Sequence, residues 1–343
     1  MLEDAIVFEV EKDNIKVQKQ VDELLQKEGI KRDKFLDYTS ALMTDDGRVV
    51  ATGSLYKNTM RCLAVDTEFQ GCGLIAKIVT ALREKELERG YSHYFGYTKI
   101  ESAVSFLPLG FYEIARIDNK LVFMENKKNG FKNYLQSLEK YKRTGSTSAI
   151  VMNANPFTYG HLNLIKTALK ESDTLHVFVL SEDESIFPSD VRLSLVEKGV
   201  SDLNGVYVHS TGPYLISNAT FPTYFLKDDS EASMIHSRLD IEMFEQIAKT
   251  LNIKKRFVGK EPFSKTTDIY NKTMRDELPK KGIELKVIPR LEIDGTAVSA
   301  SAVRTLIKKG DFESVKALVP KTTYDYLLSK DASEIIEKIK NKE

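Results

Sequence analysis

Two short segments in the second half of the chain carry residue types that could bind a polyphosphate. The first contains Thr158, Gly160 and His161 in a Thr-x-Gly-His pattern, which follows an apolar run and opens a helical pattern. Backbone N–H groups at the start of a helix have no partner within the helix, so they can bind an anion. Gly160 permits close approach of the backbone, and His161 adds a further donor. We expect a phosphate to bind at this turn.

The second segment, residues 298–304, reads Val-Ser-Ala-Ser-Ala-Val-Arg and opens another helical pattern. Ser299 and Ser301 supply hydroxyl groups, and Arg304 lies one turn further on. Hydroxyl groups and an arginine at a helix start can bind a polyphosphate and neutralise a pyrophosphate leaving group. Both serines could instead serve only as helix caps. The order of the two segments, after the first and the last strand of one series, favours a shared phosphate site.

A series of alternating strands and helices must position these segments. The apolar spacing predicts strands over residues 148–152, 174–180, 206–209, 256–259 and 284–288, and helices over residues 161–169, 189–200, 232–250, 267–278 and 299–308. Such alternation predicts a Rossmann-like, doubly wound parallel sheet with helices on both faces. Ligands of such sheets bind at the carboxyl ends of the strands, which is where the Thr-x-Gly-His turn falls.

The first part of the chain predicts a mixed α+β domain. Strands are expected over residues 5–10, 40–43, 48–56, 59–65, 94–97, 111–117 and 120–124, and helices over residues 15–26 and 74–88. A basic, polar stretch then breaks the pattern. We expect domains at residues 1–127 and 147–343, the second ending in C-terminal helices, with a linker of helix and loop at residues 128–146.

Composition narrows the class of protein. The 343 residues exceed the usual size of a single core, so two domains are expected. The chain carries 50 basic and 50 acidic residues, which argues against nucleic acid or an anionic membrane as a partner. The two cysteines, Cys62 and Cys72, make no disulfide framework, and no signal peptide or spanning apolar run is visible. A cytoplasmic location is the simplest expectation.

The two segments resemble the signatures of the nucleotidylyltransferase superfamily, [His/Thr]-x-Gly-His and Ile-Ser-Ser-Thr-x-x-Arg, although Val298 and Ala300 depart from the second. The resemblance implies chemistry at the α-phosphate of ATP, with Thr158 and His161 as catalytic residues. It implies nucleotide-binding roles for a set of further residues: Asn155, Pro156, Phe157, Gly160, Arg192, Gly259, Glu261, Ser299, Ser301 and Arg304. Gly259 could instead be a turn glycine, and Arg192 a surface arginine.

A glycine-rich turn in the first part resembles another family. Gln70, Gly71 and Gly73 match motif A of the GNAT acetyltransferases, [Arg/Gln]-x-x-Gly-x-[Gly/Ala], with Ile75 where glycine or alanine is usual. Residues 106–111 resemble the later Tyr-x-x-x-Gly-Phe segment of that family. The resemblance implies a turn that binds the pyrophosphate of coenzyme A at a helix start. The alternative is a glycine turn that serves only packing.

The pairing of these two domains, together with residues 212–225 and 261–271, resembles the citrate lyase ligase family over essentially the whole chain. That resemblance implies that ATP, with Mg²⁺, and acetate acetylate the prosthetic-group thiol on the acyl carrier subunit of citrate lyase, through an acetyl-adenylate. Ser301 and Arg304 would bind the β- and γ-phosphates, and Gln70, Gly71 and Gly73 the coenzyme-A-like arm of the carrier. No spacing of metal ligands is present, so no metal site formed by the protein itself is expected.

Two other functions stay open at this point. An adenylyltransferase that makes a coenzyme-type product would use the same ATP site and release a stable adenylyl compound. A regulatory protein that senses acyl-coenzyme A through its first domain would bind that ligand without turning over ATP. Acetate-dependent exchange of pyrophosphate into ATP separates both from a ligase.

Overall fold

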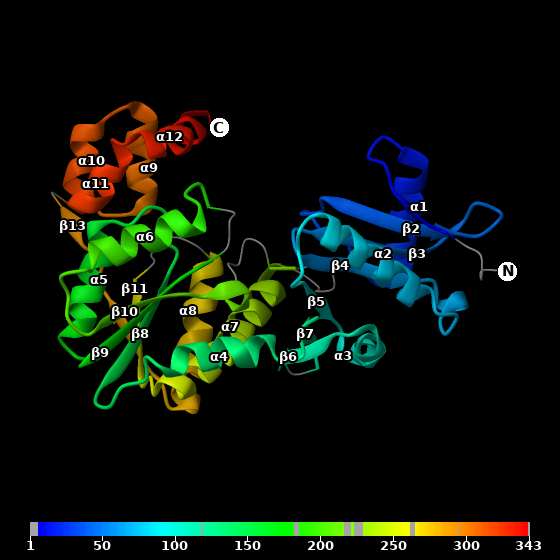
Figure 1. Ribbon diagram of the computed structural model, residues 1–343, viewed down its shortest axis with the longest axis horizontal. Helices are drawn as coiled ribbons and strands as arrows, with labels where there is room; N and C mark the ends of the chain where they lie inside the picture. The colour runs from blue at the N-terminus through cyan, green and yellow to red at the C-terminus, as the bar shows by residue number, and fades with distance from the viewer. Residues whose placement is uncertain are drawn as a thin grey trace. The chain divides into compact units, whose positions relative to one another are not determined.

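The computed structural model describes residues 6–117, 119–181, 185–215, 221–222, 229–260, 265–293 and 295–341 (Figure 1). The chain divides into two compact units. Unit 1 comprises Met1–Phe131 and Thr220–Leu239, and unit 2 comprises Lys132–Ala219 and Asp240–Glu343. The expected α/β class is confirmed in both units. The expected boundaries at residues 127 and 147 stay a prediction.

A segment from the second half of the chain contributes to unit 1. The ring of Phe221 lies 5.8 Å from that of Tyr97 and 5.0 Å from that of His236. Lys120 pairs with Glu231 at 2.9 Å. These contacts explain why residues 220–239 belong with unit 1, which the pattern of alternating strands and helices did not predict.

Unit 1 is built on a seven-stranded mixed sheet. Its strands are β1 (Val7–Glu9), β2 (Tyr38–Met43), β3 (Val49–Tyr56), β4 (Thr59–Val65), β5 (Phe95–Thr98), β6 (Tyr112–Ile117) and β7 (Leu121–Glu125), in the order β1-β2-β3-β4-β5-β7-β6. β4 and β5 are parallel, and the other neighbours are antiparallel. Each strand expected in this part of the chain is present, within a few residues of its expected bounds.

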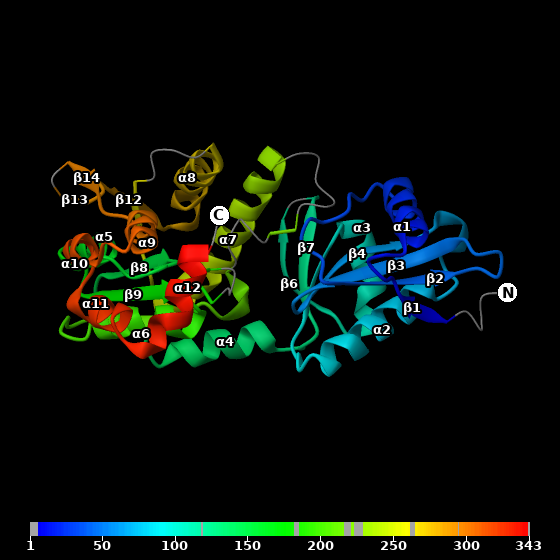
Figure 2. The same cartoon turned by 90° about the horizontal axis from the view of Figure 1, so that it is seen from above.

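Two helices cover opposite faces of this sheet (Figure 2). α1 (Ile15–Lys27) buries Val21, Leu24 and Leu25 against one face, and α2 (Leu74–Glu88) buries Ile78 and Leu82 against the other. Residues 100–109 form the short helix α3 (Ile100–Ala103) and a 3₁₀ segment, Val104–Leu109, which the sequence patterns did not predict.

Unit 2 contains the expected parallel sheet. Its strands are β8 (Thr147–Met152), β9 (Thr174–Val179), β10 (Val206–Ser210), β11 (Lys255–Gly259) and β12 (Glu284–Ile288), in the order β10-β9-β8-β11-β12. The helices are α4 (Gly130–Glu139), which begins in unit 1, α5 (Tyr159–Leu169), α6 (Ser189–Gly199), α7 (Asp229–Leu251), which also begins in unit 1, α8 (Lys265–Glu277) and α9 (Ala300–Lys309). Three C-terminal helices follow, α10 (Phe312–Leu318), α11 (Lys321–Leu327) and α12 (Ser333–Asn341), and a hairpin of β13 (Glu292–Ile293) and β14 (Thr296–Ala297) precedes α9.

Both faces of this sheet are covered, because successive side chains of a strand point to opposite sides. On β11, Phe257 belongs to the core formed with α5, α6 and α9. Its neighbour Arg256 points the other way, to Asp240 and Phe244 of α7 and Tyr270 of α8. This is the doubly wound arrangement that the alternating pattern predicts.

Each sheet has a parallel strand pair that separates toward its carboxyl end. In unit 1, β4 pairs with β5 only at Thr59 and Met60, although β4 runs to Val65. In unit 2, β8 pairs with β11 only as far as Ile150, although β8 runs to Met152. The order of strands in unit 2 reverses between β8 and β11, and ligands of such sheets bind at that point.

Candidate functional site

The Thr-x-Gly-His turn begins α5 at the carboxyl end of β8 and forms a capping box. Thr158 is the N-cap of the helix and is 1% exposed. Its backbone N–H donates to Nδ1 of His161 at 3.1 Å, and the backbone N–H of His161 donates to Oγ1 of Thr158 at 3.4 Å. The two side chains expected to act in catalysis therefore fix each other's position.

This contact determines the tautomer of His161. A backbone N–H can only donate, so Nδ1 must accept, and the proton of the neutral ring lies on Nε2. Burial, with a smaller contribution from the charge of Arg290, lowers the pKa of His161 to about 4. Near neutral pH the ring is thus uncharged and offers one N–H donor from Nε2.

Gly160 brings this turn against the segment that leads into α9. A Cβ on Gly160 would lie 2.7 Å from the carbonyl oxygen of Val298, so only glycine fits here without movement of the backbone. Ser299, the next residue, caps α9 by accepting the N–H of Ala302 at 3.1 Å. The starts of α5 and α9, which carry the two predicted phosphate-binding segments, are therefore neighbours in space.

Arg304 connects α9 to the turn after β8. One terminal nitrogen, Nη1, donates to the carbonyl oxygen of Asn155 at 2.5 Å, and Nη2 donates to Oγ of Ser301 at 3.1 Å. The arginine is half-buried, and its partial burial lowers the pKa of the guanidinium from its usual value. Ser301 is exposed. Arg304 and Ser301 can thus face a ligand together at the start of α9.

The turn residues Asn155, Pro156 and Phe157 have different surroundings. Oδ1 of Asn155 accepts the N–H of Phe187 at 3.1 Å. Pro156 is buried, and Phe157 is fully buried with its ring stacked 5.8 Å from that of His161. The side chains of Pro156 and Phe157 support the turn from the core, so only their backbone could meet a ligand at this turn.

The end of β11 is open. A Cβ on Gly259 would meet nothing within 4 Å, so packing does not require this glycine. Gly259 lies beyond the last pair of residues that joins β11 to β8, Phe257 and Ile150. Glu261, the other residue expected there, lies outside the described residues.

Arg192, in α6, is not brought to the surface of this site. It is fully buried, and its guanidinium donates to the carbonyl oxygens of Asn153, Leu180 and Phe187. The resemblance implied that this guanidinium binds the phosphates of the nucleotide. In the structure its donors point to backbone carbonyl oxygens of the protein.

One basic residue near the site was missed by sequence reasoning. Arg290 follows β12, and its Nε donates to the carbonyl oxygen of Lys260 at 2.9 Å. The positive charge of Arg290 contributes to the lowered pKa of the His161 ring. Its position directly after the last predicted strand of a parallel sheet was the available signal, since ligands bind at that edge.

The glycine turn of unit 1 begins α2. Gly71 and Gly73 have φ angles of +83° and +73°, and a Cβ on either would meet nothing within 4 Å. The turn needs glycine for its left-handed backbone, and the space in front of it is open. The first N–H groups of α2 have no acceptor within the helix.

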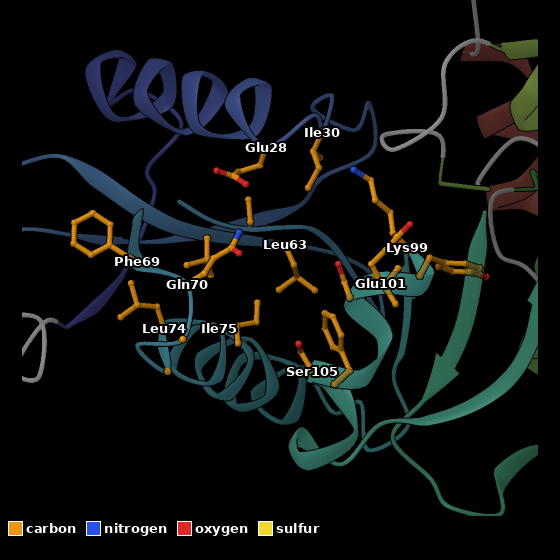
Figure 3. A pocket seen from close by; sticks show the side chains of 18 residues that line it. Glu28, Ile30, Leu63, Phe69, Gln70, Leu74, Ile75, Lys99, Glu101 and Ser105 are labelled. Atoms are coloured by element: carbon orange, nitrogen blue, oxygen red, sulfur yellow. The ribbon is translucent and has the colours of Figure 1, made fainter. Parts of the chain in front are cut away.

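A pocket of about 650 Å³ lies beside this turn, where β4 and β5 separate. Figure 3 shows Gln70 and Ile75 on one side and Lys99, Glu101 and Ser105 on the other. Its walls also include Leu63, Ala64 and Val65 of β4. All the residues expected to bind a coenzyme-A-like arm, Gln70, Gly71 and Gly73, line this pocket.

No group of three or more His, Cys, Asp or Glu side chains within the described residues could hold a metal ion. Among the helices that the structure describes, none is both long and apolar enough to cross a membrane.

Comparison with known proteins identifies relatives over most of the chain. Residues 147–327 match the family model described as the citrate lyase ligase C-terminal domain. A citrate lyase ligase of Klebsiella pneumoniae is 40% identical over 293 residues, which are 84% of this chain and 86% of the relative. A corresponding ligase of Escherichia coli strain K12 is 39% identical over 292 residues, 83% of each chain.

Solved structures are similar to smaller parts of the chain, as one example shows. A putative acyl-CoA N-acyltransferase from Klebsiella pneumoniae subsp. pneumoniae is similar to 36% of this chain over 96% of its own length, with 17% identity and a TM-score of 0.30.

Proposed function

This chain belongs to the citrate lyase ligase family, and from that premise we propose that it acetylates citrate lyase with ATP and acetate. The observation that carries the proposal is the juxtaposition of two helix starts. The carbonyl oxygen of Val298 lies where a Cβ of Gly160 in α5 would be, and Val298 precedes Ser299, the N-cap of α9. His161, Ser301 and Arg304 are the side chains that these two helix starts offer to a polyphosphate.

The first step is attack of an acetate oxygen on the α-phosphorus of ATP. A new oxygen–phosphorus bond forms, the bond to the β-phosphate oxygen breaks, and pyrophosphate leaves with that electron pair. Nε2–H of His161 and the first N–H groups of α5 stabilise the negative charge that grows on the α-phosphoryl oxygens. Arg304 and Ser301 bind the β- and γ-phosphates and balance the charge of the departing pyrophosphate.

A neutral His161 suits this task. A ring with a pKa of about 4 is uncharged before ATP binds, so it meets the nucleotide as an oriented N–H donor. Thr158 holds the ring through Nδ1, which directs Nε2 away from the helix. We therefore assign Thr158 to orientation of His161 and leave proton transfer to other groups.

In the second step, the thiolate of the prosthetic group attacks the acyl carbon of acetyl-adenylate. A carbon–sulfur bond forms, the bond between the acyl carbon and the phosphate oxygen breaks, and AMP leaves with that oxygen and its electron pair. We propose that the carrier subunit of citrate lyase presents this thiol on a coenzyme-A-like arm. The pocket of unit 1 supports this assignment, because the glycine turn offers N–H groups to a pyrophosphate and the open edge of β4 offers backbone partners to an extended amide chain.

Mg²⁺ is proposed to accompany ATP. The described residues offer no cluster of acidic or imidazole ligands, so the phosphate oxygens and water would supply most of its ligands. When bound, the ion would neutralise part of the charge on the polyphosphate.

The test is exchange of labelled pyrophosphate into ATP, measured with and without acetate. A ligase of this kind exchanges label only when acetate is present, and it releases AMP when the thiol-bearing lyase is added. Exchange that ignores acetate, or accumulation of a stable adenylyl product in place of AMP, would refute the proposal.

A further inference from the structure

Two arginines of unit 2, Arg192 and Arg256, are buried, with exposed fractions of 0% and 2%. Arg256 donates to Oδ2 of Asp240 at 2.9 Å and to the hydroxyl of Tyr270 at 3.0 Å, and it stacks over Phe244. These contacts fasten α7 and α8 to β11. The contacts of Arg192 lead toward the phosphate site instead.

Arg192 connects three segments near the carboxyl ends of the strands. Its Nη1 donates to the carbonyl oxygen of Asn153 at 2.9 Å and to Oδ1 of the same residue at 2.7 Å. The same nitrogen lies 2.6 Å from the carbonyl oxygen of Leu180, and Nε donates to that of Phe187 at 2.9 Å. A single guanidinium therefore fixes the turn after β8 against the end of β9 and the residues before α6.

The turn after β8 passes these contacts on to Arg304. The N–H of Phe187 donates to Oδ1 of Asn155, and the backbone carbonyl of Asn155 accepts from Nη1 of Arg304. Arg192 thus holds both Phe187 and the turn after β8, which together determine where the Asn155 carbonyl lies. Arg304 also donates to Ser301 of its own helix.

We propose that Arg192 is a positioning residue, which sets the location of the Arg304 guanidinium through residues 153–155 and does not itself bind phosphate. The inference rests on the proposed role of Arg304 at the β- and γ-phosphates. Its physical basis is that charged donors stabilise a leaving pyrophosphate only at the correct distance, and a displacement of about 1 Å can cost about 100-fold in rate.

The experiment is a double-mutant cycle on Arg192→Lys and Arg304→Lys, read by acetate-dependent pyrophosphate exchange at saturating ATP. Each single variant is expected to lower the exchange rate about 100-fold, through misplacement of Arg304 or loss of its bidentate donors. Both changes act on the guanidinium of Arg304, and effects of residues that act together do not add. The exchange rate of the double variant is therefore also expected to be about 100-fold lower.

Arg256→Lys supplies the matched control. It alters an arginine of similar burial in the same unit, so it is expected to lower the melting temperature. Because the described contacts of Arg256 lie on α7 and α8 rather than on the turn after β8, the effects of Arg256→Lys and Arg304→Lys on the exchange rate should multiply. Melting curves without ligand identify variants that fail to fold. If Arg192→Lys does not fold, Asn153→Ala removes one acceptor of the guanidinium and is tested in the same cycle.

The outcomes separate this inference from the proposed function. If the unaltered protein catalyses exchange and the Arg192 and Arg304 effects multiply to about 10,000-fold, Arg192 does not act through Arg304 and the inference is overturned. If Arg192→Lys raises the KM for ATP with kcat unchanged, Arg192 contributes only uniform binding, which also overturns it. An absence of acetate-dependent exchange in the unaltered protein would instead refute the proposed function.

Discussion

The glycine turn of unit 1 and the helix starts of unit 2 offer N–H groups to an anion, but they use glycine for different physical reasons. Gly71 and Gly73 adopt left-handed backbone angles and have open space around them. Gly160 has an ordinary backbone angle, and it is required because the Val298 carbonyl lies where its Cβ would be. The first arrangement is local to one turn, whereas the second depends on two helices that meet.

The side chains differ in the same way. In unit 2, His161 and Arg304 are each held by another residue, Thr158 and Asn155 respectively. In unit 1, the pocket combines a polar glycine turn with apolar walls such as Leu63 and Ile75. Fixed donors suit a reacting phosphoryl group, and an open pocket with both polar and apolar walls suits a flexible arm.

The largest expected effect is that of His161→Ala in unit 2. Loss of one oriented donor to the α-phosphoryl group should lower acetate-dependent pyrophosphate exchange about 100- to 1,000-fold. Because the ring is neutral with a pKa of about 4, the loss should be equal at every pH between about 6 and 8. Lys166→Ala, an exposed change on the same helix, is the control. A loss that disappears at high pH would point to a charged histidine.

Gly160→Ala tests the contact between the two helix starts. The added Cβ would meet the Val298 carbonyl, so α5 and α9 must separate, and exchange should fall about 100-fold. The melting temperature should fall too. Gly259→Ala adds the same methyl group where nothing lies within 4 Å, and it should leave the melting temperature unchanged. Equal melting temperatures for the two variants would contradict this account of Gly160.

Gly73→Asp tests the glycine turn of unit 1. A carboxylate beside a bound pyrophosphate should cost about 2 kcal/mol, or about 30-fold, in acetyl transfer to the carrier, and it should spare pyrophosphate exchange. Gly47→Asp is the matched control, because that glycine also has a positive φ and open surroundings, in a hairpin turn. Loss of both activities with normal folding would argue against separate tasks for the two units.

Arg290→Gln should have a smaller effect. The positive charge of Arg290 lowers the pKa of His161, and the Nε of Arg290 donates to the backbone carbonyl of Lys260. Because the variant loses this charge beside the site, pyrophosphate exchange should fall about tenfold, equivalent to about 1.4 kcal/mol. Arg275→Gln, a change in α8, is the control. An unchanged exchange rate would restrict Arg290 to a structural contact.

The smallest effect expected is a dependence of stability on pH. Burial lowers the pKa of His176 to about 4 and of His209 to about 3, below the value of about 6.5 in an unfolded chain. Groups of this kind stabilise the fold above pH 6.5, and that stability is lost as pH falls toward 4. Denaturant unfolding should show this slope, and His209→Gln should reduce it. An identical slope in the variant would exclude His209 as a source.

Much of unit 2 could be predicted from the sequence. Each expected strand and helix of its parallel sheet is present within a few residues, because apolar spacing along the chain reflects which faces are buried. Thr158 and His161 were predicted from a local pattern, and their capping box is also local. The order of β8 and α9 in the series was enough to suggest that their two segments meet.

The remaining features depend on residues that are far apart in the chain. Arg304 meets Asn155 across 149 positions, and the pattern around either residue contains no sign of that contact. Residues 220–239 fold with unit 1 through contacts of Phe221 with Tyr97, which no local period could reveal.

The two α/β units, the helix starts that can bind phosphate and the residue types placed there follow from the amino-acid sequence alone. The burial of Arg192 against carbonyl oxygens, the effect of the Arg290 charge on His161 and the separation of two parallel strand pairs became visible only in the folded chain. The cause of this division is that propensity and capping act between neighbours in the chain. The partner of a guanidinium and the end of a strand pairing depend on which distant backbone atoms packing brings close.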